Sequence, residues 1–324
     1  MKVLVLGGAG YIGAHMCKLL AEHGHAVVVC DDFSTGHRGA VQWGECVEAS
    51  LGDEIALDGL FGRHRFDAVM HFAAHSQVGE SVSDPLRYYR NNVGSTLTLL
   101  DAMRRRGVRR FVFSSTAAVY GEPQTSPIDE QHPTQPLNPY GRTKLAIEQA
   151  LADCAQAYGL RAVALRYFNA AGADPSGCIG ESHQPETHLI PRLLRKAAGE
   201  DLDVRIFGDD YPTADGTCIR DYIHVNDLAD AHLKALEHLD AAGGFQCFNL
   251  GNGQGYTVRQ VIAAVEEVVG RPLDIAVGPR RAGDPTALVA SSARAKTVLG
   301  WVPRSAEMRT MIETAWRWHR QPRY

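Results

Sequence analysis

The sequence predicts an α/β fold in which a doubly wound parallel sheet is followed by a smaller C-terminal α/β domain. Short apolar runs recur in the first half of the chain, each separated from the next by a helix-length segment. Parallel strands are buried on both faces and need crossover helices, so this alternation predicts βαβ units. We expect strands at 2–7, 26–31, 67–73, 110–115 and 161–168.

Beyond residue 170 this alternation is interrupted by the Pro- and Gly-bearing segment 171–188, which we interpret as the crossing into the second domain. The stretch 220–236 resembles a strand followed by a helix, and 244–253 resembles a further strand, so the chain is expected to return to the first sheet. We therefore predict a first domain over 1–170, with a return near 219–252, and a second domain over 171–324.

The basic run 104–110 and the C-terminal run 316–320 are interpreted as ordinary helix ends. In the first run, arginines precede Gly107, which matches cations near a helix C-terminus and a glycine stop. In the second, two tryptophans are expected to pack inward from an amphipathic terminal helix.

Composition excludes several classes of protein. The 324 residues suffice for about two domains, and the formal charge of -4 argues against binding nucleic acid through phosphate contacts. No apolar run reaches the roughly 20 residues of a membrane span, and the first residues have too short an apolar core for a signal peptide. We therefore expect a cytoplasmic protein with no nucleic-acid or membrane partner.

Cysteine and histidine spacing gives no indication of a metal. The seven cysteines are scattered, odd in number and never spaced C-x-x-C, which favours reduced packing residues over disulfides or zinc. His71 and His75 are four residues apart, but their segment is a predicted strand end running into a loop. The sequence thus predicts no metal site.

A glycine-rich turn directly after the first predicted strand suggests a dinucleotide site. Gly7, Gly10 and Gly13 form G-x-x-G-x-x-G at the start of a predicted helix, where they permit a tight turn and bring backbone N–H groups close to a pyrophosphate. The second strand ends at Asp31, whose carboxylate can accept ribose hydroxyl hydrogen bonds and repels a 2′-phosphate. We predict a Rossmann-type sheet that binds NAD; a glycine turn used only for packing is the alternative.

The chain contains one YxxxK motif, Tyr140 and Lys144, just after a helix-start signal in which Asn138 is the N-cap and Pro139 the first helical residue. This spacing places both side chains on one helix face. A nearby ammonium and the positive nicotinamide ring would lower the pKa of the phenol, so that Tyr140 could take a hydroxyl proton while hydride leaves the same carbon. Thr116 is suited to hold that hydroxyl. A surface pair without a catalytic role is the alternative.

The G-x-x-G-x-x-G turn followed by YxxxK resembles the extended form of the short-chain dehydrogenase/reductase superfamily. Further stretches, "HFAAHSQVGES", "SSTAAVYG", "NPYGRTK", "RYFNAAGA", "ETHLIP" and "RRAGDP", resemble the UDP-glucose 4-epimerase family over nearly the whole chain. The resemblance implies an isomerase that interconverts UDP-galactose and UDP-glucose: C4 is oxidised, the 4-keto sugar rotates and is reduced again, and tightly bound NAD is regenerated each cycle. It also implies a homodimer and a C-terminal domain that binds the nucleotide sugar.

The same resemblance assigns site residues position by position. NAD is expected to contact Gly7, Gly10, Tyr11, Ile12, Gly13, Asp31, Asp32, Ser34, Asp53, Phe72, Ala73, Ala74, Ser114, Tyr140, Lys144 and Phe168. The UDP-sugar is expected to contact Thr116, Asn169, His188, Leu189, Arg205, Phe207, Arg220, Arg281, Asp284 and Leu288. Among these, the two arginines Arg220 and Arg281 match the pyrophosphate ligands, and Asp284 matches the contact to the uridine ribose.

Departures from related patterns refine the expectation. Sugar-nucleotide 4,6-dehydratases carry an acidic pair after the Ser/Thr, whereas this chain has Ala117 and Ala118, which counts against dehydration. Ser76 stands where some epimerases have a lysine, and Gly94 and Ser95 replace an Asn-Gly pair. Leu288 replaces a tyrosine that closes the sugar pocket in some members, so we hypothesise that UDP-N-acetylhexosamines also fit.

Two alternative functions remain open at this point. One is another UDP-sugar enzyme of the extended family, such as a UDP-pentose 4-epimerase, since one pocket wall decides whether a C6 hydroxymethyl group fits. The other is a catalytically silent NAD-sensing protein with the same fold. The intact Thr116, Tyr140 and Lys144 argue against the sensor.

Overall fold

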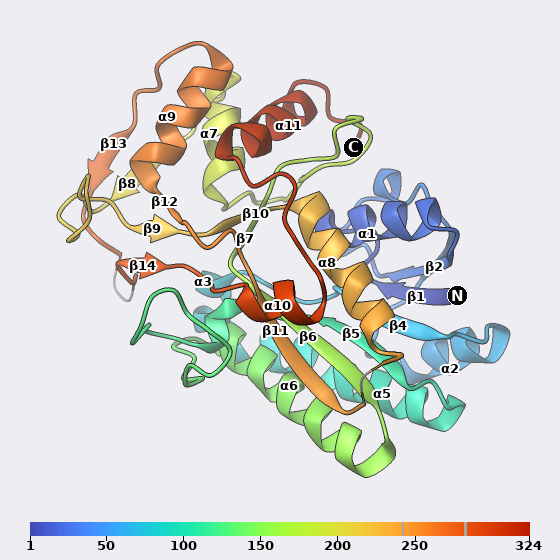
Figure 1. The fold of residues 1–324 in the computed structure, drawn as a ribbon. Coiled ribbons are helices and arrows are strands. Elements are labelled where there is room, and N and C mark those ends of the chain that lie inside the picture. Colours follow the sequence, from blue (N-terminus) through green and yellow to red (C-terminus); the bar gives the residue numbers. More distant parts are fainter. Residues whose placement is uncertain (242, 282–283) are drawn as a thin grey trace.

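The computed structural model describes residues 1–324 except 242 and 282–283. Its centre is a seven-stranded sheet in the order β11-β6-β5-β4-β1-β2-β3, and all neighbouring strands in it pair in parallel. The predicted Rossmann-type doubly wound sheet is therefore confirmed (Figure 1). Its strands are β1 (Lys2–Leu6), β2 (Ala26–Asp31), β3 (Glu45–Glu48), β4 (Ala68–His71), β5 (Arg110–Ser114), β6 (Arg161–Tyr167) and β11 (Phe245–Leu250).

Helices cover both faces of this sheet, because its strands are apolar on both sides. Alternate residues of β1 belong to different cores: Val3 and Val5 pack under α1 (Tyr11–Glu22) and α8 (Val225–His238), whereas Leu4 and Leu6 pack on the other side. That second side is covered by α2 (Glu54–Arg63), α5 (Ser95–Arg106) and α6 (Pro139–Tyr158). The period-two alternation of the strand thus builds two cores at once.

A separate hydrophobic cluster holds the C-terminal lobe together. It is formed mainly by one face each of α7 (Leu189–Ala197), α9 (Val258–Val269) and α11 (Met308–Arg320), seen together in the upper part of Figure 1. Three small sheets adjoin it: β7 (Asn169–Ala171) with β10 (Tyr222–His224), β8 (Arg205–Phe207) with β13 (Ala276–Gly278), and β9 (Ile219–Arg220) between β12 (Tyr256–Thr257) and β14 (Ala287–Leu288).

Short helical segments complete the chain. They are α3 (Val78–Ser83), α4 (Pro85–Tyr88), a π-helix at Tyr89–Gly94, α10 (Ala293–Val298) and 3₁₀ turns at Arg38–Ala40 and Ala117–Val119. The expected return to the first sheet corresponds to α8, which packs beside α1, and to β11, where Phe245 pairs with Ala162 of β6. The boundary between 1–170 and 171–324 stays a prediction.

The helix-end signals identified in the sequence act as expected. The Asn138 side chain accepts a hydrogen bond from the Gly141 N–H (2.9 Å) at the start of α6, with Pro139 in its first turn. Gly107 follows α5 in the left-handed region (φ 71°), and Trp318 of the terminal helix is buried. The sequence analysis missed β3, because its exposed, mostly polar residues do not form an apolar run.

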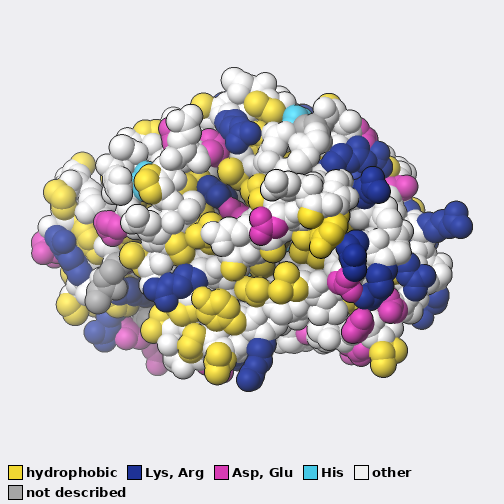
Figure 2. All heavy atoms as spheres, turned by 90° about the horizontal axis from the view of Figure 1, so that it is seen from below, with side chains coloured by type: hydrophobic (Ala, Val, Ile, Leu, Met, Phe, Trp, Pro, Cys, Tyr) yellow, Lys and Arg dark blue, Asp and Glu magenta, His cyan; other side chains and the backbone are white. Residues whose placement is uncertain are grey.

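All seven cysteines are free thiols, in the interior as well as on the surface. No helix in the part of the chain that the structure describes is long and apolar enough to cross a membrane. Hydrophobic side chains gather in patches on the face seen from below in Figure 2, the side on which α5 and α6 lie in Figure 1.

Candidate active site

The glycine-rich turn lies between β1 and α1, and close packing explains two of its three glycines. Gly7 has φ 76°, and a Cβ there would lie 2.6 Å from the backbone nitrogen of Ala73; a Cβ on Gly13 would lie 2.1 Å from the carbonyl oxygen of Gly7. Both positions thus require glycine whether or not a ligand is bound. Gly10, the N-cap of α1, has no contact that close (3.3 Å to the nearest atom) and faces a cavity.

That cavity lies at the carboxyl ends of β1, β2 and β4, next to the point where the strand order reverses, which is where open α/β sheets bind ligands. Eight residues predicted to contact NAD line it: Gly7, Gly10, Asp31, Asp32, Ser34, Phe72, Ala73 and Ala74. Other lining residues that the sequence analysis did not propose include Ser50, Leu51, His75 and Asn91.

Asp31 occupies the end of β2, as the motif requires. Its carboxylate accepts hydrogen bonds from the backbone N–H groups of Ala9 and Phe33, both at 2.9 Å, which hold the glycine turn against β2. Burial raises the pKa of this carboxyl, and the two backbone hydrogen bonds oppose the shift. Since each carboxylate oxygen has a second lone pair, Asp31 can still accept ribose hydroxyls. The glycine cradle and this acceptor fit a dinucleotide.

The other eight residues predicted to contact NAD are not in the wall of this cavity: Tyr11, Ile12, Gly13, Asp53, Ser114, Tyr140, Lys144 and Phe168. Asp53 instead caps α2, where its side chain accepts the N–H of Ala56 at 3.0 Å. Tyr11 donates its hydroxyl to the carbonyl of Gly172, 2.6 Å away. For these two side chains the structure therefore shows a structural contact.

Tyr140 and Lys144 lie one turn apart on α6, and their surroundings differ from the prediction. Burial raises the pKa of Tyr140 to about 12, and a hydrogen bond with Thr116 opposes this shift. The sequence analysis expected the ammonium of Lys144 to lower the pKa of the phenol, but its Nζ is 6.0 Å from the centre of the Tyr140 ring. In the protein alone the pKa of the phenol is raised, because desolvation of the phenolate is the larger effect. The predicted lowering, which includes the positive nicotinamide ring, stays a prediction.

Lys144 is the more strongly perturbed member of the pair. Its side chain is buried, its Nζ donates to the carbonyl oxygen of Ser114 at 2.9 Å, and it lies 4.7 Å from the centre of the Phe113 ring. Burial lowers the pKa of this amine to about 7, although the more distant carboxylate of Glu148 raises it. Lys144 is thus a buried amine that changes charge near neutral pH.

Hydrogen bonds connect α6 with the cavity wall, and β5 with β6. The side chain of Asn92 donates to the Thr143 hydroxyl (3.0 Å) and accepts the N–H of His75 (2.9 Å), which lines the cavity. Ser114 and Tyr167 share a hydrogen bond of 2.5 Å between their hydroxyls. The sequence analysis gave Asn92 and Tyr167 no role, although Tyr167 lies in the family-like stretch "RYFNAAGA".

A buried ion pair lies beside these residues and was also missed. Glu148, one turn after Lys144, faces Arg166 of β6 at 2.5 Å and accepts the hydroxyl hydrogen of Ser115. Arg166 in turn donates to the hydroxyl of Tyr120 at 2.8 Å. Both charged side chains are almost fully buried, so the pair fixes α6 against the sheet.

The residues predicted to bind the UDP-sugar form two close pairs in the C-terminal half. Arg220 of β9 donates to Asp284 at 2.7 Å, with both side chains partly buried. The guanidinium of Arg281 lies 3.8 Å from the centre of the Phe207 ring. Leu288 of β14 packs on the cluster that contains Ala117 and Val119, next to Thr116.

The other residues predicted to contact the UDP-sugar make contacts within the protein. Asn169 donates to the carbonyl of Asp221 at 2.8 Å, and Leu189 begins α7, partly buried against the C-terminal cluster. Arg205 forms an exposed ion pair with Asp203 (2.8 Å). His188 faces two carboxylates, described below. Their predicted roles toward UDP stay predictions.

Comparison with known proteins agrees with this geometry. Residues 3–251 match the model of the NAD dependent epimerase/dehydratase family. The chain belongs to this family. It is 54% identical to a UDP-glucose 4-epimerase of Halalkalibacterium halodurans over 99% of this chain and 96% of that protein, and 53% identical to one of Rhizobium leguminosarum over 98% of this chain and 97% of that protein.

Solved structures of the epimerase/dehydratase family include close structural neighbours of this chain. The UDP-glucose 4-epimerase from Brucella ovis in complex with NAD has a TM-score of 0.95 and 53% identity, covering 97% of both chains. That from Bifidobacterium longum in complex with NAD⁺ and UDP has a TM-score of 0.94 and 38% identity, covering 99% of both. The resemblance to UDP-glucose 4-epimerases predicted from the sequence is confirmed.

Membership of an epimerase/dehydratase family leaves two reaction classes, and one local feature separates them. A dehydratase needs an acid near C6 of the sugar. Here the two positions after Thr116 are Ala117 and Ala118, at the start of a 3₁₀ turn whose N-cap is Thr116, with its side chain accepting the N–H of Ala118 at 3.1 Å. The turn offers no proton donor there, which favours epimerisation.

Proposed function

We propose that this NAD-dependent epimerase interconverts UDP-galactose and UDP-glucose by oxidation at C4, rotation of the 4-keto sugar and reduction from its other face. The observation that carries the proposal is the partly buried phenol of Tyr140, near Thr116 and one helical turn from Lys144, in a chain about half identical to epimerases over its full length. NAD, when bound, supplies the hydride acceptor and donor for C4.

The residues of this chain manage the proton. Tyr140 accepts the proton of the 4-hydroxyl as the carbonyl forms and returns it when the carbonyl is reduced, and Thr116 orients that hydroxyl by a hydrogen bond. Because burial opposes ionisation of the phenol, the phenolate needs positive charge nearby, which Lys144 provides in its protonated state. The carbonyl of Ser114 holds the amine in place.

Two arginines are proposed to hold the diphosphate, as the resemblance implies. Arg220 is positioned by its ion pair with Asp284 and by hydrogen bonds to the carbonyls of Ile219 and Pro285, so its planar head is oriented before the ligand arrives. Arg281 stacks on Phe207, which leaves the edge of its guanidinium available for phosphate oxygens.

The decisive test is to mix the purified protein with UDP-galactose, add no cofactor, and follow the anomeric sugar signals by NMR. Conversion to a stable mixture with UDP-glucose is expected, because resident NAD ends each cycle oxidised. No change would overturn the proposal and favour either the silent NAD sensor or another nucleotide sugar. UDP-xylose in a parallel sample distinguishes the alternative pentose epimerase.

Leu288 is proposed to leave room for an N-acetyl group, so UDP-N-acetylgalactosamine should also turn over. The Leu288→Tyr variant is expected to lower kcat/KM for this sugar about 10–200-fold relative to UDP-galactose, because a bulky side chain excludes an extra group. The hypothesis fails if the unaltered protein converts UDP-galactose but not UDP-N-acetylgalactosamine.

The homodimer and the cytoplasmic location are likewise proposals. Support for the dimer comes from an apolar groove between α5 and α6, lined among others by Leu97, Leu100 and Met103. Leu97 is 49% exposed in the single chain, and such a surface is typical of a subunit contact. Light scattering of the purified protein should give twice the chain mass, and Leu97→Asp should reduce it to one chain.

A further inference from the structure

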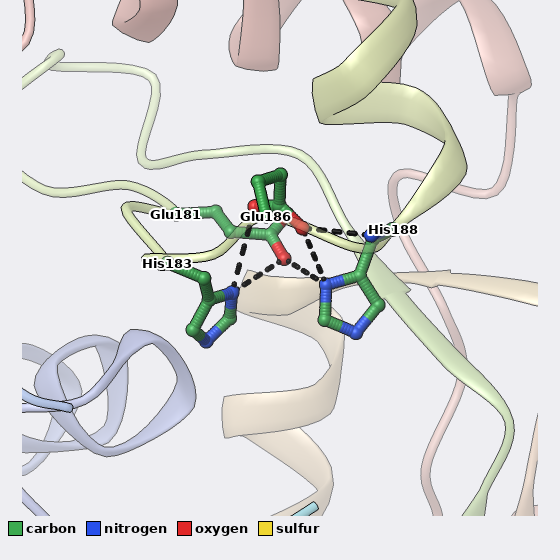
Figure 3. Close-up of side chains that lie close together, drawn as sticks. All are labelled: Glu181, His183, Glu186 and His188. Atoms are coloured by element: carbon green, nitrogen blue, oxygen red, sulfur yellow. Dashed lines mark hydrogen bonds and ion pairs between the residues drawn. The ribbon is translucent and has the colours of Figure 1, made fainter. Parts of the chain in front are cut away.

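Four side chains near the start of α7 converge, and the proposed proton transfer and diphosphate binding use none of them, although the resemblance assigns His188 a contact to the UDP-sugar. Glu181, His183, Glu186 and His188 offer one oxygen or nitrogen each, and these atoms all lie within 4.8 Å of one another. Figure 3 shows that both imidazole rings direct Nδ1 at the carboxylates and Nε2 away. The sequence predicted no metal site, because neither the cysteine spacing nor the pair His71 and His75 indicates one.

The distances within this cluster are those of ligands around one ion. Nδ1 of His188 is 2.9 Å from an oxygen of Glu181 and 2.9 Å from one of Glu186. Nδ1 of His183 is 3.0 Å and 3.6 Å from oxygens of the same two residues. Zinc bonds of about 2.0–2.2 Å in a tetrahedron place neighbouring ligand atoms roughly 3.3–3.6 Å apart. Three of the four N···O distances are shorter than this spacing, one matches it, and every other pair of ligand atoms lies within 4.8 Å, so shifts of the side chains would complete the geometry.

Charge and burial also favour a cation. The side chains of Glu181 and Glu186 are only 6% and 3% exposed. Among the described residues, no lysine or arginine forms an ion pair with either carboxylate. Burying two negative charges costs several kcal/mol each unless they are compensated. The two histidine side chains and, for Glu186, the backbone N–H of His188 (2.7 Å) contact the carboxylates, and a bound cation would add compensating charge.

The backbone around the cluster is held in place from several sides. The indole of Trp318 donates to the carbonyl of Glu181 at 2.8 Å, and His37 hydrogen-bonds the carbonyl of Ser182 at 2.6 Å. The ring of Tyr11, at the start of α1, meets the His183 ring edge-on at 6.3 Å. The ligands thus lie on a loop that contacts both the cofactor turn and the last helix, so their positions are set before a metal arrives.

We propose that Glu181, His183, Glu186 and His188 bind one divalent transition metal ion, zinc in the first place, in a closed site of two imidazoles and two carboxylates. Imidazole nitrogen favours zinc, copper, iron or nickel over magnesium and calcium. Four protein ligands leave no position for substrate, which is typical of a structural site. The metal would fix the loop before α7 to α1 and α11, and it would take Nδ1 of His188 and leave Nε2 for the UDP-sugar contact that the resemblance implies.

The alternative is a metal-free quartet of ion pairs. Burial lowers the pKa of both histidines, but the two carboxylates outweigh this effect. They raise the pKa of His183 to about 9 and that of His188 to about 10. In that case both histidines would be protonated at neutral pH and would donate hydrogen bonds to the carboxylates. The experiment must therefore detect a metal directly.

The first measurement is the metal content of the tag-free protein, determined by elemental mass spectrometry. The chelator-treated protein is then titrated with Zn²⁺ in a calorimeter. We expect binding of one zinc ion per chain. His183→Gln should weaken it by more than about 100-fold, because even changes behind the ligands cost 10–100-fold. His64→Gln is the matched control, since it removes a histidine from another His–Glu pair (3.4 Å from Glu45) and should leave zinc binding unchanged.

A second readout uses the unaltered protein, in case the variant fails to fold. Co²⁺ added to the chelator-treated protein should give the visible absorption bands of tetrahedral cobalt, and Zn²⁺ should remove them. The proposal would be overturned if the unaltered protein bound no more zinc than a folded His183→Gln variant, or if cobalt gave only the spectrum of the hydrated ion. The cluster would then be a set of ion pairs.

Discussion

Two buried cations lie on neighbouring elements: Lys144 on α6 and Arg166 on β6. The first is proposed to take part in the reaction, and the second holds the structure together. Both are at least 95% buried. Arg166 faces a carboxylate of Glu148 at 2.5 Å, which keeps it charged, whereas Lys144 has only the carbonyl of Ser114 within hydrogen-bond distance among the described residues. Burial therefore lowers the pKa of Lys144 to about 7. The lysine, whose amine can lose its proton, has no counter-charge beside it, whereas the arginine, which stays charged at any accessible pH, has one.

The largest expected effect is on the reaction, at Tyr140, one helical turn from Lys144. Tyr140→Phe should reduce turnover of UDP-galactose by about 10²–10⁴-fold, the usual contribution of a positioned acid–base group, while NAD stays bound. Steady-state kinetics and the absorbance of the released cofactor measure both quantities. Tyr256→Phe, which removes a hydroxyl in the C-terminal lobe, is the control and should keep its activity. Full activity in Tyr140→Phe would show that the proton goes elsewhere.

The next largest effect tests the ion pair between Glu148 and Arg166. Glu148→Gln should lower the free energy of unfolding by about 3–5 kcal/mol, because it leaves the buried guanidinium of Arg166 without a counter-charge. Denaturant titration measures this loss. Glu313→Gln removes the exposed pair with Arg309 and should cost about 0–1 kcal/mol. Equal losses in the two variants would contradict the assignment of Glu148 as a structural partner.

The smallest effect is a pH dependence that belongs to Lys144. Its pKa is lowered by folding from 10.5 to about 7, so between these values the unfolded chain binds more protons than the folded one. Stability from this residue therefore increases with rising pH across that window, by at most about 1.4 kcal/mol per pH unit. The unaltered protein should gain stability relative to Lys144→Met between pH 7 and pH 9, measured by denaturant titration. A constant difference would place the pKa of Lys144 outside this window.

The same contrast explains what could be predicted from the sequence. The strands β1, β2, β4, β5 and β6 were predicted because buried parallel strands are continuous apolar runs, and the start of α6 because Asn138 and Pro139 act locally. The pair of Glu148 and Arg166 was missed, since nothing local connects residues on a helix and on the next strand.

The chemistry of the site was predicted in part. The residue types at positions 140 and 144 follow from a motif, but the direction of the Tyr140 pKa in the protein alone depends on how much water reaches the hydroxyl. The metal-binding hypothesis was missed for a similar reason, because two glutamates and two histidines within eight residues do not form a known metal-binding motif.

The place of β11 at the edge of the central sheet has a consequence for synthesis on the ribosome. Phe245 pairs with Ala162, so β6 lacks its outer neighbour until about 80 further residues have been translated. At roughly 5–20 residues per second this takes about 4–16 s. During that time the nascent chain presents an open edge of β6 to other copies, and a translational pause before residue 245 would prolong that exposure.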